Sequence, residues 1–163
     1  MHQFNKTVNL IDTSTIEVKS QIITEERKQQ SLNNNKLDWS DFTILIAEDE
    51  EHSFIYMHTI LEVTGIKILR AKNGRECVEL VRKEPSVDLI LMDVQMPVMN
   101  GMEATKAIKS FRKDITIITQ TAFALKENKE NCKAVGSDDF LTKPIRVATL
   151  LKTLGKYLDS STE

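Results

Sequence analysis

The segment that decides the fold is residues 89–101, Leu-Ile-Leu-Met-Asp-Val-Gln-Met-Pro-Val-Met-Asn-Gly. Its first four residues, together with Val87, are apolar, which predicts a strand covered on both faces. Asp93 follows at the point where such a strand leaves its sheet, and a loop with a proline and an Asn-Gly turn comes next. Open α/β sheets bind ligands at this edge. Taken alone, the segment leaves two interpretations open, because Asp93 could be a functional carboxylate or a residue that caps a turn.

The composition predicts one globular domain with a tail or linker. The chain has 163 residues, of which 40% are hydrophobic and 28% charged, and its formal net charge is −2. The chain has no excess of positive charge that would favour binding to nucleic acid or to anionic lipid. No apolar run approaches the roughly 20 residues that a membrane helix needs, and residues 1–20 lack the pattern of a secretory signal. We therefore expect a cytoplasmic protein without direct nucleic-acid or membrane contact.

Residues 1–41 are interpreted as a linker or connector that is largely irregular. They are rich in Gln, Asn, Ser, Thr and Glu and contain neither proline nor glycine, which is typical of segments that cannot bury a core. Residues 7–11 and 15–18 are candidates for short strands within it. Trp39 is expected to anchor the linker against the following domain, which spans residues 42–160.

From residue 43 onward, short apolar runs alternate with helical patterns. The expected strands span residues 43–47, 66–69, 87–92, 115–120 and 138–142. Helices are expected for about fourteen residues after the acidic run 48–51, between Asn73 and Pro85, and over residues 103–112, 125–135 and 147–158. Short loops between such elements call for parallel strands joined by right-handed crossovers. The predicted fold class is α/β, with a doubly wound parallel sheet of five strands and five helices.

Polar residues follow the predicted strands at their carboxyl ends. Glu48 and Asp49 follow the first strand, Asp93 the third, Thr121 the fourth and Lys143 the fifth. All these ends lie on one edge of a parallel sheet, where three carboxylates would repel one another unless a cation lies between them. Carboxylate oxygens suit Mg²⁺, and Mn²⁺ would fit the same ligands. An ionised Asp93 could then attack a phosphoryl group, with Lys143 and Thr121 holding its oxygens.

The chain resembles the receiver domain of two-component response regulators over about residues 42–160. The motifs that carry the resemblance are Ile-Leu-Ile-Ala-Glu-Asp-Glu at 44–50, Leu-Met-Asp-Val-Gln-Met-Pro-Val-Met-Asn-Gly at 91–101, Thr-Ala at 121–122, and Asp-Asp-Phe-Leu-Thr-Lys-Pro at 138–144. Each motif alone is weak, but the ordered set is specific. The resemblance implies a flavodoxin-like fold with the strand order 2-1-3-4-5.

The resemblance also implies a role for each acidic residue. Asp93 would take a phosphoryl group from the phosphohistidine of a histidine kinase or a histidine phosphotransfer domain. Mg²⁺ would be held by Asp49, Asp93 and the backbone carbonyl of Gln95, while Glu48 would act mainly through a metal-bound water. The chain would thus catalyse its own phosphorylation and dephosphorylation.

Further expectations concern the switch, the partners and the phosphate lifetime. Phe140 would swing inward as Thr121 moves toward the phosphoryl group, and a static core aromatic is the alternative. The exposed face of the first helix is the expected docking surface for the donor, with His52, Ile55, Tyr56 and Thr59. A weak dimer through the fourth and fifth helices is also considered. The lifetime would depend on Gln95 and Phe123, and the bulk of Phe123 predicts minutes or longer.

The sequence departs from many receivers at one position and favours one kind of relative. Many receivers have an apolar residue before the Thr-Ala pair, whereas this chain has Gln120. Together with Trp-Ser-Asp-Phe at 39–42, the pattern is similar to receivers of hybrid sensor histidine kinases, so residues 1–41 would connect to an upstream kinase core. The alternatives are a free-standing response regulator and a degenerate receiver that serves only as an interaction module. A haloacid-dehalogenase-like phosphatase is disfavoured because it would want Asp where Gln95 stands.

Overall fold

The computed structural model describes residues 37–122 and 126–159. In chain order the elements are β1 (Thr43–Ala47), α2 (Glu51–Glu62), β2 (Lys67–Ala71), α3 (Gly74–Lys83), β3 (Leu89–Asp93), α4 (Gly101–Phe111), β4 (Thr116–Thr121), α5 (Lys126–Ala134), β5 (Asp139–Thr142) and α6 (Val147–Leu158). The candidate strands at 7–11 and 15–18, and Phe123, lie outside the described residues. None of the helices in the described part is long and apolar enough to cross a membrane.

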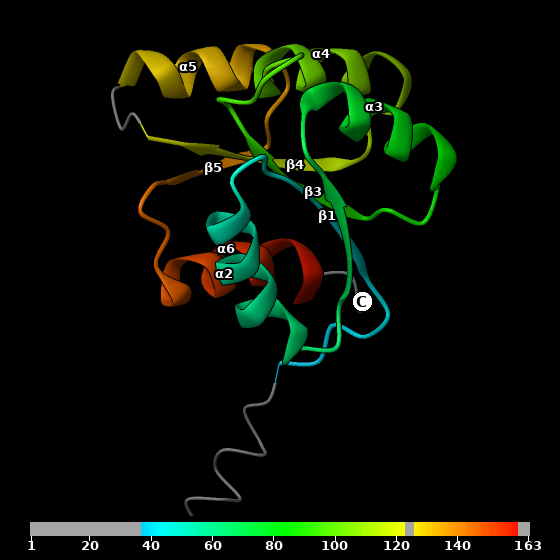
Figure 1. Ribbon diagram of the computed structural model, residues 1–163, viewed down its shortest axis with the longest axis vertical. Coiled ribbons are helices and arrows are strands. Elements are labelled where there is room, and N and C mark those ends of the chain that lie inside the picture. Colours follow the sequence, from blue (N-terminus) through cyan, green and yellow to red (C-terminus); the bar gives the residue numbers. More distant parts are fainter. Residues whose placement is uncertain (1–36, 123–125, 160–163) are drawn as a thin grey trace, which may run out of the picture. The chain divides into compact units, whose positions relative to one another are not determined.

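The five strands form one parallel sheet in the order β2-β1-β3-β4-β5. Helices α2 and α6 cover one face of this sheet, and α3, α4 and α5 cover the other (Figure 1). The predicted fold class and the strand order implied by the resemblance are both confirmed. Because β1 and β3 are neighbours, the residues that follow them come together at one edge.

The core explains why the strands have so few polar residues. All five residues of β1 and all five of β3 are buried, as expected for strands covered on both faces. One cluster on the α3 and α4 side contains, among others, Leu45, Ile90, Met92, Ile117, Cys77, Val81, Ala104 and Ile108. Cys77 and Cys132 are both buried free thiols.

Several predicted boundaries are wrong by one or two residues, and local hydrogen bonds explain the shift at the start of α4. The helix expected from residue 103 begins at Gly101, because Asn100 and Glu103 form a capping box. We interpreted Asn100 and Gly101 as a turn. The helix after the acidic run has twelve residues rather than fourteen, and Thr121 belongs to β4 rather than to the loop behind it.

Trp39 is fully packed against the C-terminal end of the described chain. Its side chain is 1% exposed, and its indole Nε1 donates a hydrogen bond to Oδ1 of Asp159 at 2.8 Å. Its backbone nitrogen donates to the carbonyl of Thr64, just after α2, at 2.8 Å. A buried indole needs such a partner for its N–H. Trp39 therefore joins the residues after α2 to the end of α6.

Gly101 allows α4 to begin directly against the end of β3. A Cβ atom at this position would lie 2.0 Å from the backbone oxygen of Asp93. Such a distance is far below van der Waals contact, so any side chain would push the start of α4 away from Asp93. The Gly101 nitrogen also donates to the Val94 carbonyl at 3.0 Å, which fixes the loop between them.

We predict that Gly101→Ala lowers the free energy of unfolding by about 1–3 kcal/mol, the usual effect of forcing an atom into a packed site. Gly155→Ala in α6 is the matched control. A Cβ atom at Gly155 would lie 2.8 Å from Oδ2 of Asp159, whose Oδ1 accepts from Trp39, so this carboxylate has to turn slightly. The gain of about 0.5–1 kcal/mol in helix stability offsets this cost, and the net change is expected to be smaller than at Gly101. Urea unfolding measures both variants, and equal stabilities would contradict the close approach at Gly101.

Candidate functional site

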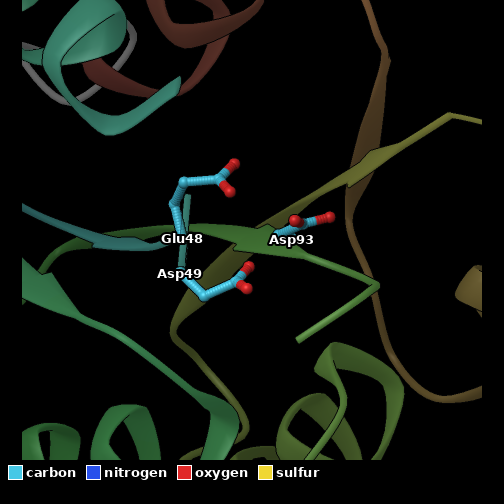
Figure 2. A group of neighbouring side chains, drawn as sticks. All are labelled: Glu48, Asp49 and Asp93. Carbon is cyan, nitrogen blue, oxygen red and sulfur yellow. The ribbon is translucent and has the colours of Figure 1, made fainter. Parts of the chain in front are cut away.

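Three carboxylates converge where β1 and β3 end. Glu48 and Asp49 directly follow β1, and Asp93 is the last residue of β3. One carboxylate oxygen from each lies within 4.8 Å of the corresponding oxygens of the other two. Figure 2 shows that Glu48 and Asp49 leave the chain in different directions, with both carboxylates turned to the side where Asp93 lies. Glu48 and Asp93 are buried, whereas Asp49 is exposed.

Lys143 pairs with two of these carboxylates from the end of β5. Its Nζ lies 2.9 Å from Oε2 of Glu48 and 2.8 Å from Oδ2 of Asp93. The lysine is in place because its backbone nitrogen donates to the carbonyl of Thr121 at 2.8 Å. Since β4 separates β5 from β3, the long lysine side chain reaches across the end of β4.

The pKa values of Glu48 and Lys143 reflect this crowding. Burial of the Glu48 carboxylate raises its pKa, the charge of Asp93 adds to the rise, and the hydrogen bond from Lys143 opposes it. Burial lowers the pKa of Lys143, but its bonds to Asp93 and Glu48 outweigh burial and leave that pKa above the ordinary value. The stabilisation from protonated Lys143 is therefore complete below the ordinary lysine pKa and is lost as pH rises through the raised value.

The loop after β3 holds the Asp93 carboxylate in place. The backbone nitrogen of Gln95 donates to Oδ1 of Asp93 at 3.2 Å, and the Val94 nitrogen donates to the Gln120 carbonyl at 3.0 Å. The Gln95 side chain is exposed. Its backbone carbonyl as a metal ligand stays a prediction, but the residue does lie at the site.

Thr121 and Phe140 occupy the neighbouring strands. Thr121 is the last residue of β4 and is 5% exposed. Phe140 is half-buried on β5 and is paired in register with Thr119. The structure thus places Thr121 at the same edge as the acids, whereas Phe140 lies one strand further out. Their joint movement stays a prediction.

The other two acids of the run 48–51 have structural roles. Glu50 is the N-cap of α2, and its carboxylate accepts from the backbone nitrogens of His52 at 3.0 Å and Ser53 at 2.6 Å. These bonds, together with one from the His52 side chain, lower the pKa of Glu50 to about 2. Glu51 pairs with Arg70 at 2.6 Å. The run is therefore divided between the site and the start of a helix.

Arg70 is a site neighbour that the sequence reasoning missed. From β2 it pairs with Glu51, and its Nη2 donates to the backbone carbonyl of Glu48 at 3.4 Å. Its guanidinium also lies 4.2 Å from the centre of the Phe54 ring. Arg70 thus links β2 to the acidic segment that follows β1. The sequence feature that could have identified it is a single arginine within the otherwise apolar run Ile-Leu-Arg-Ala at 68–71.

The acid cluster fits a hard divalent cation. It offers carboxylate oxygens only, and one of its members is exposed, so water can complete the coordination. Mg²⁺ prefers a few carboxylates with several waters. Exposed acidic groups often occur without a metal, but here two of the three are buried, and burial of like charges is unfavourable without a counter-charge.

The predicted docking surface on α2 is exposed beside the site. Ile55 is 51% and Tyr56 43% exposed, and His52 and Thr59 are exposed as well. The Tyr56 hydroxyl donates to the carbonyl of Ile145, in the segment after β5, at 3.0 Å. This bond joins α2 to the segment that follows Lys143.

Comparisons with known proteins agree with this geometry. Residues 44–155 match the response regulator receiver domain family. The chain is 36% identical over 118 residues to the polar-differentiation response regulator DivK of Brucella anthropi, which covers 71% of this chain and 95% of that protein.

Two solved structures illustrate the structural similarity. One is the Saccharomyces cerevisiae complex of the histidine phosphotransfer signalling protein Ypd1 with the receiver domain of Ssk1, at 30% identity and a TM-score of 0.72, covering 76% of this chain and 92% of the matched one. The other is the receiver domain of the sensor histidine kinase PA1611 of Pseudomonas aeruginosa with magnesium in its active-site cleft. It is 30% identical, with a TM-score of 0.67, covering 72% and 98%.

We predict that Lys143→Met destabilises the metal-free protein by about 3 kcal/mol, because it leaves two buried carboxylates without their counter-charge. Added Mg²⁺ is expected to restore part of the loss. Lys156→Met is the matched control, since its partner Asp139 lies at a similar 3.0 Å but the lysine side chain is 55% exposed. Surface pairs contribute roughly 0–1 kcal/mol. Urea unfolding in EDTA and in Mg²⁺ checks this, and equal losses in both variants would contradict it.

Proposed function

This chain belongs to the response regulator receiver domain family, and we propose that it accepts a phosphoryl group from phosphohistidine onto Asp93. The observation that carries the proposal is the contact of the buried Asp93 carboxylate with Lys143, beside two further acids. A carboxylate that is paired with a lysine and lies beside a cation can act as a nucleophile.

The proposed transfer forms one bond and breaks another. An oxygen of Asp93 attacks phosphorus, the P–N bond to the donor imidazole breaks, and its electron pair returns to the imidazole nitrogen. The Lys143 ammonium can move its contact from the Asp93 carboxylate to a phosphoryl oxygen as Asp93 becomes an acyl phosphate. Thr121 can donate its hydroxyl to another phosphoryl oxygen from the end of β4.

We further propose that the cation is Mg²⁺, held by Asp49, Asp93 and the backbone carbonyl of Gln95, with Glu48 acting through water. When bound, it would neutralise the carboxylates and the phosphoryl oxygens. The exposure of Asp49 and the burial of Glu48 support this division of roles.

The readout is proposed to run through the end of β4. A new doubly negative group next to Lys143 favours any arrangement that brings donors closer to it. Thr121 is the last residue of β4 and carries a hydroxyl, and Phe140 is half-buried on the adjacent strand. The switch is therefore proposed to couple the acceptor site to the α5 and β5 side of the sheet.

The proposed donor is a histidine kinase or a histidine phosphotransfer domain that contacts the α2 surface of His52, Ile55, Tyr56 and Thr59. This surface is exposed, it borders the segment after Lys143, and it joins that segment through the bond from Tyr56 to Ile145. A donor on this surface would bring its imidazole to the side of the sheet edge where Lys143 lies.

Two protein contexts have relatives that support them. The match covers 95% of DivK, a response regulator with little besides a receiver domain, and this supports a free-standing regulator. The similar PA1611 receiver belongs to a sensor histidine kinase, which supports the hybrid setting. The reading frame upstream of Met1 decides between them, because a kinase core there would establish the hybrid.

We predict that phosphoramidate with Mg²⁺ adds the mass of one phosphoryl group to the wild-type chain and none to Asp93→Asn. The exposed residue Asp114 provides the control, and Asp114→Asn is expected to be modified like the wild type. Intact mass spectrometry and omission of Mg²⁺ complete the experiment. An unmodified wild type would instead favour a degenerate receiver that only binds partners.

We predict that Ile55→Ala slows transfer from phosphorylated Ypd1 by at least about fivefold, the effect of losing a contact worth roughly 1 kcal/mol. Val63→Ala, also exposed at 66% but at the far end of α2, is expected to have no effect. Phosphoramidate bypasses docking, so both variants are expected to match the wild type with it. Equal rates for both variants with Ypd1 would place the docking surface elsewhere.

A further inference from the structure

A pocket beside the acceptor site is lined by a buried polar side chain that the proposed function does not use. It lies between α2 and the segment after β5, has a volume of about 430 Å³, and is lined in part by Tyr56, Met57, Gln120, Lys143, Pro144 and Ile145. This volume falls within the roughly 300–1,000 Å³ of typical small-ligand pockets. The hydrogen bond from Tyr56 to Ile145 holds the two sides together.

Gln120 is the unusual residue of this pocket. It is 0% exposed on β4, and neither its Nε2 nor its Oε1 has a hydrogen-bond partner among the described residues. A buried amide without partners is destabilising, and nearly all such groups in proteins are paired. Packing therefore does not explain a glutamine here, where an apolar residue would fill the same space.

The chemistry of the Gln120 side chain specifies the class of ligand. An amide side chain offers a donor and an acceptor side by side, so a group that presents the complementary pair in one plane satisfies both at once. Primary carboxamides and lactams have this geometry, whereas a carboxylate can only accept. The terminal torsion of a glutamine is soft, which lets the amide turn toward a ligand. The walls from Tyr56, Met57, Pro144 and Ile145 suit an apolar or aromatic ring.

We propose that this pocket binds a small ring-bearing carboxamide, whose amide group pairs with the side chain of Gln120. Lys143 lines the same pocket and contacts Asp93, so the ligand would lie next to the acceptor site and against Tyr56 of the α2 docking surface. The inference goes beyond the proposed function and does not depend on phosphorylation of Asp93.

Benzamide is the probe, and ¹⁵N–¹H correlation NMR of the full chain is the measurement. Benzamide at millimolar concentration is expected to shift the assigned side-chain NH₂ pair of Gln120 and the backbone signals of Met57 and Ile145. Gln120→Leu is expected to weaken binding at least about tenfold, since two hydrogen bonds are lost. The same variant is expected to unfold at a higher temperature than the wild type, because it removes an unpaired buried amide.

Leu61→Met is the control for general disturbance of the α2 packing, because it changes a buried residue outside the pocket with little change in volume. It is expected to bind benzamide within about twofold of the wild type, as mutations at separate sites act independently. Benzoate is the control ligand. Absence of a shift at the Gln120 amide in the wild type overturns the proposal, even if Gln120→Leu fails to fold. Equal binding of benzoate and benzamide overturns it too, since that would indicate simple attraction to Lys143.

Discussion

Repulsion among the carboxylates of Glu48, Asp49 and Asp93 is the constraint on which the site depends. Parallel pairing of β1 with β3 brings their carboxyl ends together, and each added buried negative charge makes the next one less favourable. In the described structure the ammonium of Lys143 offsets part of this repulsion by contacting two of the three acids. The same ammonium is the group that a phosphoryl oxygen would attract. The interaction that stabilises the resting site and the one that would stabilise the product therefore share one cation, so the proposed phosphorylation of Asp93 would redistribute the contacts of Lys143.

The arrangement of strands makes this sharing possible. With the order β2-β1-β3-β4-β5, Lys143 has to reach over the end of β4 to meet Asp93. Its path passes the strand that carries Gln120 and Thr121, and its backbone is tied to the Thr121 carbonyl. A change in the orientation of the Lys143 side chain would therefore first affect the residues at the end of β4. This gives a physical reason for the proposed readout through Thr121, and for the location of the carboxamide pocket beside the same side chain.

The sequence predicts much of this structure because two periodicities are clear. Apolar runs bounded by acids or turns locate the strands, and the spacing of Leu150, Leu154 and Leu158 places α6 with the observed bounds. Parallel topology places the acids at one edge of the sheet, and the pairing of β1 with β3, which only the resemblance implied, brings them together. The start of α4 was wrong because Asn100 suits both a turn and a helix cap, and only its bond with Glu103 decides. The roles of Arg70 and Gln120 could not be predicted from the sequence, since a polar residue inside a buried strand does not reveal its partners. Residues that conflict with their local pattern in this way are expected at functional sites.

A structure determined with Mg²⁺ and BeF₃⁻ tests the central claim most directly, because beryllium fluoride on a carboxylate stands in for an acyl phosphate. The account predicts beryllium on an oxygen of Asp93, a fluorine next to the Lys143 ammonium, and a metal about 2.1 Å from oxygens of Asp49 and Asp93. Beryllium fluoride bound to another acid, or a metal bound without Asp93, would contradict the assignment of Asp93 as the phosphoryl acceptor.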